Sequence, residues 1–172
     1  NKGVIANITT LDPPLSPMLW TSIATGMTAD KHGILGFVEP EPNSTKIRAA
    51  TSTSRKVKAI WNILTQKGFK THTVGWWPSH PAEPINGICV SNEFAAAKGP
   101  INSEWPLPKG TIYPETFSET LSQLRIHPEE ITHAHILPFL PLAATIDQTQ
   151  DKGIQVISRI LSECSSYHAA AT

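Results

Sequence analysis

The sequence predicts an α/β fold with a mainly parallel sheet. The clearest signal is an amphipathic helix over residues 56–67, in which apolar side chains recur at helical spacing. These apolar positions are Val57, Ile60, Trp61 and Leu64. Gly68 is suited to end this helix, and residues 71–76 follow as an apolar strand. The order of helix, glycine turn and strand is typical of units whose strands pair in parallel.

Two further apolar segments complete the predicted sheet. Residues 3–9 and 88–91 are short, rich in branched apolar side chains and bounded by turn-forming residues, so each is expected to be a buried strand. We expect both to join the strand at 70–76 in one mainly parallel sheet. The helices predicted at 17–26 and 56–67 should pack on this sheet, because each has one apolar face.

The rest of the chain predicts a division into three parts. Residues 1–92 form the first part of the α/β core, and residues 93–148 have few strand signals, so they are interpreted as an insertion or cap. A helix is expected to begin at Pro114, since proline favours the first helical position. Residues 149–172 are expected to return to the core as a helix, with regularly spaced apolar positions from Asp151 onward.

Composition excludes several classes of function. Apolar residues make up 40% of the chain, which is enough for a core. The 14 basic and 14 acidic residues balance and form no basic stripe, so a nucleic-acid polymer is not the expected partner. No apolar run approaches the roughly 20 residues that span a bilayer, so no membrane segment is expected in this chain. The chain opens with Asn1 rather than Met and is expected to be a fragment.

The chemically informative stretch is residues 13–34, which place a serine at the start of a helix. Ser16 is expected to be the N-cap and Pro17 the first helical residue. The first N–H groups of a helix lack internal partners and its dipole is positive there, so a phosphate or sulfate group is stabilised nearby. A serine hydroxyl is a weak nucleophile until a base or metal activates it. From Ser-Pro alone, a purely structural cap remains the alternative.

The wider pattern resembles the type I phosphodiesterase and nucleotide pyrophosphatase branch of the alkaline phosphatase superfamily. In that branch a Thr or Ser nucleophile precedes a helix ending in Thr-Gly, here Thr25-Gly26. A His-Gly-Ile follows, here residues 32–34, and this alignment puts Ser16 at the nucleophile position. Residues 77–80, Trp-Pro-Ser-His, resemble a Trp-Pro-Gly-Ser element of related pyrophosphatases. The resemblance covers about residues 3–92.

This resemblance implies a metal-dependent hydrolase of phosphate, phosphonate or sulfate esters that acts through a covalent seryl intermediate. The implied fold is an alkaline-phosphatase-like three-layer sandwich, incomplete in this chain. The implied cofactors are two divalent metal ions, with zinc expected, which Ser16 would bridge while the other ligands lie outside the chain. The isolated fragment is therefore expected to be inactive. The implied substrate is a small-molecule phosphoryl or sulfuryl ester.

Other polar and aromatic residues have assigned roles in this hypothesis. Trp77 and His80 are expected to contact substrate, whereas His32 is expected to support the turn after the nucleophile helix. Nucleotide pyrophosphatases have an Asn after His-Gly-Ile that holds a phosphate oxygen, and Phe37 stands at the matching position. Nucleotide phosphodiesters are therefore in doubt as substrates. Metal binding by the His-x-His pair at 133 and 135 is not expected, since i and i+2 diverge on a helix.

The basic residues at the start of the second helix are expected to form a solvated face. These residues are Arg55, Lys56 and Lys58.

Two alternative functions remain open. They are a phosphoglycerate-mutase-like isomerase, which shares the superfamily fold, and a non-catalytic fragment or pseudoenzyme. The local motif around Ser16 differs from that of the mutases, and the missing metal ligands favour the non-catalytic reading of this chain in isolation.

Overall fold

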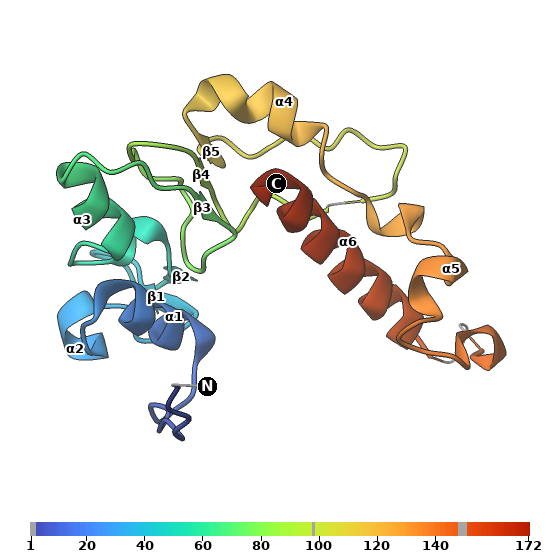
Figure 1. The fold of residues 1–172 in the computed structure, drawn as a ribbon, viewed down its shortest axis with the longest axis horizontal. Helices are drawn as coiled ribbons and strands as arrows, with labels where there is room; N and C mark the ends of the chain where they lie inside the picture. Colours follow the sequence, from blue (N-terminus) through green and yellow to red (C-terminus); the bar gives the residue numbers. More distant parts are fainter. Residues whose placement is uncertain (1–2, 98, 148–150) are drawn as a thin grey trace.

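The computed structural model describes residues 3–97, 99–147 and 151–172. The helices are α1 (Ser16–Thr25), α2 (Ala29–His32), α3 (Ile60–Gln66), α4 (Ser118–Ser122), α5 (His133–Ile136) and α6 (Gly153–Ala171). The strands are β1 (Val38–Pro40), β2 (Ile47–Ala49), β3 (Thr73–Val74), β4 (Cys89–Val90) and β5 (Ile112–Tyr113). Figure 1 shows the β3–β5 sheet between two groups of helices, with α1 to α3 on one side and α5 and α6 on the other.

The central sheet is small and mixed. β3 pairs with β4 in parallel, with Thr73 opposite Cys89, and β5 joins β4 in the antiparallel direction. The α/β class and the strands predicted near 70–76 and 88–91 are therefore confirmed, although each strand is only two residues long. The sheet is not mainly parallel, because one of its two strand pairs, β4 with β5, is antiparallel. β5 belongs to residues 93–148, where no strand was predicted. The three-layer sandwich stays a prediction.

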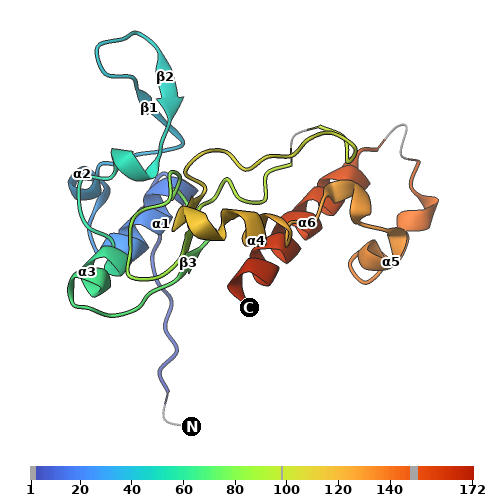
Figure 2. The same cartoon turned by 90° about the horizontal axis from the view of Figure 1, so that it is seen from above.

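The prediction of a strand at residues 3–9 is wrong. The segment forms no strand, and Val4, Ile5 and Ile8 are 96%, 101% and 94% exposed. An apolar pattern indicates that a segment can be buried, but a strand also needs a neighbour for its N–H and C=O groups. Among the described residues, no strand pairs with this segment. Figure 2 shows the segment running away from the body of the molecule.

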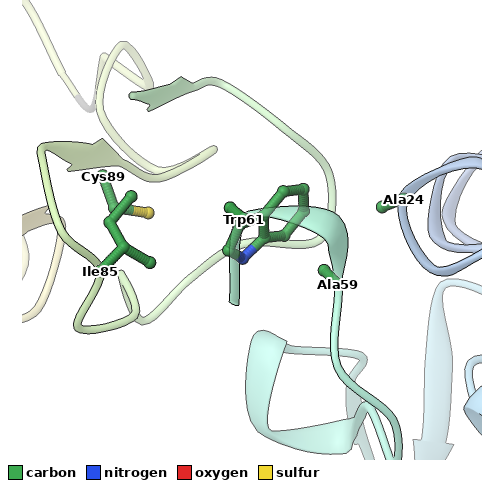
Figure 3. Close-up of a cluster of buried hydrophobic side chains, with 5 residues drawn as sticks. All are labelled: Ala24, Ala59, Trp61, Ile85 and Cys89. Carbon is green, nitrogen blue, oxygen red and sulfur yellow. The ribbon is translucent and has the colours of Figure 1, made fainter. Parts of the chain in front are cut away.

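The helix predicted at residues 56–67 begins later, at Ile60. The Asn62 side-chain oxygen accepts the backbone N–H of Ala59 at 2.9 Å, which fixes the start of α3. Arg55 donates to the same oxygen at 3.0 Å and so holds the preceding segment outside the helix. The helix still packs on the sheet as predicted. Figure 3 shows its Trp61 in a buried cluster between Ala24 of α1 and the Ile85–Cys89 region.

The C-terminal helix packs against the sheet at one close approach. Gly75, with φ of 64°, lies against Tyr167 of α6, and a Cβ there would come within 2.9 Å of the Tyr167 ring. Tyr167 also donates a hydrogen bond from its hydroxyl to the Asn92 carbonyl at 2.8 Å.

Among the described residues, no helix is long and apolar enough to cross a membrane. The three-part division at 92 and 148 stays a prediction, and its second boundary lies outside the described residues.

The hairpin after α2 was not predicted from the sequence. β1 and β2 form an antiparallel hairpin, with Val38 opposite Ala49 and Asn43 in the left-handed region at φ of 58°. Figure 2 shows the hairpin projecting from the side opposite the N-terminal segment. Its strands are three residues long and mostly exposed, so they lack the apolar alternation that identifies a strand.

Candidate active site

Ser16 is the first residue of α1, and its side chain is exposed. The N–H of Leu19 bonds to the carbonyl of Leu15 at 3.0 Å, so Leu15 is the N-cap. The expectation that Ser16 caps the helix is therefore wrong by one residue, and Pro17 occupies the second helical position. Within the described parts of the chain, the Ser16 hydroxyl has no hydrogen-bond partner. It is therefore not used in stabilising the helix.

The helix that carries Ser16 is anchored along one face. The buried residues of α1 are Pro17, Met18, Thr21 and Ala24. The Thr21 hydroxyl bonds back to the Pro17 carbonyl at 2.7 Å, and Gly26 ends the helix in the left-handed conformation at φ of 66°. These contacts fix the helix start in the molecule while leaving Ser16 accessible.

His32 supports the turn after α1, as the resemblance implied. The ring is 0% exposed, and its Nδ1 accepts the Ile34 N–H at 3.1 Å. A neutral imidazole therefore carries its proton on Nε2, which donates to the Ser22 hydroxyl at 3.0 Å. Burial lowers the pKa of His32, with nearby Asp30 opposing the shift and Arg55 adding to it. Both nitrogens are occupied, so His32 does not offer a lone pair to a metal.

His80 lies in a loop that a neighbouring asparagine holds firmly. The Asn92 side-chain oxygen accepts the backbone N–H groups of Ser79 and His80, at 2.8 and 3.0 Å. The Asn92 N–H donates in return to the Ser79 hydroxyl at 3.1 Å. His80 Nδ1 lies 3.1 Å from the hydroxyl of buried Ser91. The loop follows β3 and Asn92 follows β4, so this cluster lies at the carboxyl ends of two parallel strands, where open α/β sheets bind ligands.

The two adjacent tryptophans of this loop have different surroundings. Trp76 packs edge-on against Trp20 and Trp61, with ring centroids 5.4 and 5.7 Å apart. Trp77 instead contacts Phe37, with centroids 5.0 Å apart. Both rings are partly buried, so the two tryptophans differ in their aromatic partners rather than in their burial.

The Trp77 ring is linked to the start of α1 through the turn at residues 36 and 37. A Cβ at Gly36 would lie 3.4 Å from the Leu15 side chain, so this turn packs beside the N-cap of α1. Phe37 follows directly and is half exposed. Leu15, Phe37 and Trp77 thus lie in one connected region, and Ser16 follows Leu15 directly in the chain. Among the described residues, no direct contact joins Ser16 to His80.

A metal centre is not complete in the described residues. They contain no group of three or more His, Cys, Asp or Glu side chains that could hold an ion. His133 and His135 do not converge, since His135 Nδ1 accepts the Thr132 N–H at 3.0 Å and His133 lines a separate cavity with Glu129. The exposed Ser16 oxygen could supply one ligand, but the donor set does not by itself fit a metal site.

Sequence reasoning missed two sets of residues. The first set is Ser91 and Asn92, which hold the His80 loop. They are two polar residues after a predicted strand, and nothing in the sequence indicates that they contact residues 79 and 80. Arg55 was expected on a solvated face, and this expectation is wrong. Its side chain is 6% exposed, and it binds Glu83 through bonds of 2.6 and 2.7 Å. The partner lies 28 residues away, so local patterns could not reveal the pair.

The fold and this site define an α/β protein with an accessible serine at a helix start and a fixed polar loop at the carboxyl edge of its sheet. The family model for type I phosphodiesterase / nucleotide pyrophosphatase matches residues 1–159, and the chain belongs to this family. The family acts on small phosphoester substrates and is generally metal-dependent. Comparison with curated proteins and with solved structures gave no significant match.

Proposed function

We propose that this protein hydrolyses phosphate, phosphonate or sulfate esters of small molecules, with Ser16 as the covalent nucleophile. The observation that carries the proposal is the exposed Ser16 hydroxyl, which lies at the first position of α1 without a hydrogen-bond partner among the described residues. A serine that served only as a cap would accept a backbone N–H of the first turn. The family match adds hydrolysis of phosphoesters as the reaction class.

The start of α1 is suited to hold the anionic oxygens of such an ester. Its first N–H groups lack internal partners, and Pro17 has no N–H, so Ser16 and Met18 provide the nearest donors. The positive end of the helix dipole stabilises negative charge at the same place. These groups would orient the ester with its electrophilic atom next to Ser16 Oγ.

The proposed reaction has two balanced steps. Ser16 Oγ forms a bond to the phosphorus or sulfur atom while the bond to the leaving alcohol oxygen breaks, and the Ser16 proton is transferred to that alcohol. Water then adds its oxygen to the same atom, the Ser16 bond breaks, and a proton returns to Oγ. Two divalent metal ions, with zinc expected, would lower the pKa of the hydroxyl in the full-length protein. Their remaining ligands would come from outside the described residues.

Trp77 and His80 are proposed to bind the substrate. Trp77 and Phe37 form an aromatic surface beside the start of α1, which suits an apolar part of the leaving group. His80 has its Nδ1 engaged by Ser91, so its Nε2 is left to bond with an ester oxygen. Phe37 stands where nucleotide pyrophosphatases have an asparagine that holds a phosphate oxygen. The loss of this contact argues against nucleotide diesters as the preferred substrates.

The test combines turnover with detection of the intermediate. The full-length protein, supplied with zinc, is assayed against a panel of p-nitrophenyl phosphate, phosphonate and sulfate esters. Acid quenching during turnover, followed by peptide mass spectrometry, should find the phosphoryl or sulfuryl group on Ser16. Turnover with the modification on another residue contradicts the assignment of Ser16.

A second candidate function is binding without turnover. The lack of a three-residue metal cluster in the described ranges favours it for these residues in isolation. Metal analysis of the full-length protein separates the two functions. A hydrolase should retain zinc through purification, whereas a binding protein should hold the ester substrates without zinc and release no alcohol.

A further inference from the structure

A groove of about 500 Å³, lined mainly by polar residue types, lies on the molecule between residues 52–58, α3 and residues 83–84. Its volume is within the range of small-molecule sites, which runs from about 300 to 1,000 Å³. The residues that line it and carry hydrogen-bonding side chains include Ser52, Thr53, Lys56, Lys58, Thr65 and Gln66. The lining contains three cationic side chains and one carboxylate, in a chain whose formal net charge is zero.

One wall of the groove is fixed by the buried ion pair. Glu83 accepts two bonds from Arg55 and a third from the Trp61 ring N–H at 2.8 Å. Arg55 also donates to Asn62 and to the Val57 carbonyl. The carboxylate is therefore fully engaged with Arg55, and it is not available to neutralise the two lysines of the groove.

The two lysines bring positive charge that no carboxylate balances. Among the residues the structure describes, neither Lys56 nor Lys58 forms an ion pair. The stem of Lys56 is packed over Gly33, within 3.0 Å of where a Cβ would lie. Lys58 Nζ donates to the side-chain oxygen of Gln66, another lining residue, at 3.0 Å. Both lysines line the groove, so an anion bound there would be attracted by two positive charges.

We propose that this groove binds the phosphate group of a small, polar phosphate monoester. Lys56 and Lys58 would contact the phosphate, since ammonium groups bind this dianion as point charges. The groove is larger than a phosphate ion, and its hydroxyl and amide groups suit a hydroxyl-rich body attached to the phosphate. The lining residues do not include any part of α1, so the site is separate from Ser16 and does not depend on the proposed hydrolysis.

The test measures binding of glycerol 3-phosphate at constant ionic strength, using the Ser16→Ala chain so that the probe is not consumed. Backbone amide shifts are followed by NMR, and the affinity is compared with that of the Lys56→Gln/Lys58→Gln double variant. The matched control is Lys46→Gln/Lys70→Gln, which also removes two positive charges, from exposed lysines outside the groove lining. We expect shifts within residues 52–66 and an affinity at least about tenfold weaker in the double variant, with no change in the control.

Three outcomes overturn the proposal. Equal affinity of the double variant and the control shows that the lysines do not recognise the probe. Equal binding of glycerol without phosphate shows that charge is not recognised. Shifts confined to residues 15–19 place the phosphate at the start of α1, which supports the proposed hydrolase site while refuting the groove. Conversely, the Ser16→Ala protein can lose turnover and still show amide shifts at residues 52–66 when glycerol 3-phosphate is added. This result supports the groove as a separate phosphate site.

Discussion

The two parts of the candidate site differ in how their polar groups are used. Ser16 lies on α1 with no hydrogen-bond partner among the described residues, whereas the His80 loop is held by Asn92, Ser79 and Ser91 through several bonds. Removing a group without partners leaves the fold unaffected, while removing a group that satisfies buried N–H donors destabilises it. The comparison therefore separates a residue suited to chemistry from residues that position others.

The largest expected effect is on turnover in Ser16→Ala of the full-length protein. Loss of a covalent nucleophile should reduce the rate by at least about 10³-fold. Stability should change by less than about 1 kcal/mol, because Ser16 does not cap α1. Steady-state kinetics and thermal melting measure the two quantities, with Ser44→Ala as the control at another exposed serine. If turnover and thermal stability of Ser16→Ala both fall modestly and in proportion, Ser16 has a structural role and is not the nucleophile.

Asn92→Ala should reverse this pattern. It leaves the N–H groups of Ser79 and His80 without their acceptor, which should destabilise the fold by about 2–4 kcal/mol. Urea denaturation measures the loss, and Asn102→Ala, at an exposed asparagine, should cost almost nothing. Asn92→Asp keeps the acceptor oxygen and should recover much of the stability. An Asn92→Ala protein as stable as the control would show that the bonds to Asn92 do not hold the loop.

His80→Gln should affect substrate binding more than the chemical step. The proposed role of His80 is a bond from Nε2 to an ester oxygen, so KM should rise by about tenfold with kcat nearly unchanged. Exposed His168 provides the matched control in His168→Gln. A fall in kcat at unchanged KM would move His80 from substrate binding to the chemical step.

The smallest expected effect is a pH dependence of stability from His32. Its folded pKa lies below the unfolded value of about 6.5, so the unfolded state binds the proton more readily. The stability due to neutral His32 is fully present above pH ~6.5 and is lost as the pH falls through the folded pKa. Chemical denaturation between pH 7.5 and 5 should show this loss, and His32→Asn should flatten the curve in that window. Parallel curves for the two proteins would assign the dependence to other groups.

Sequence reasoning succeeded where neighbours along the chain decide the structure. The helix that starts at Ser16 and ends at Gly26 follows from proline and glycine positions, and the apolar spacing around Trp61 predicted α3. The parallel pairing of β3 and β4 followed from the order of helix, turn and strand. The start of α3 was misplaced by a few residues, because an asparagine side chain rather than propensity sets it.

By itself, the sequence determined which segments can be helix or strand and which serine begins a helix in a family motif. Only the tertiary structure decided that residues 3–9 pair with no strand and that Asn92 holds the His80 loop. The tertiary structure also decided that Arg55 is buried in an ion pair with Glu83. The physical reason is that helix starts and apolar periodicity depend on residues within one or two turns. Hydrogen bonds and ion pairs between residues 12 to 28 positions apart depend on where the whole chain places them.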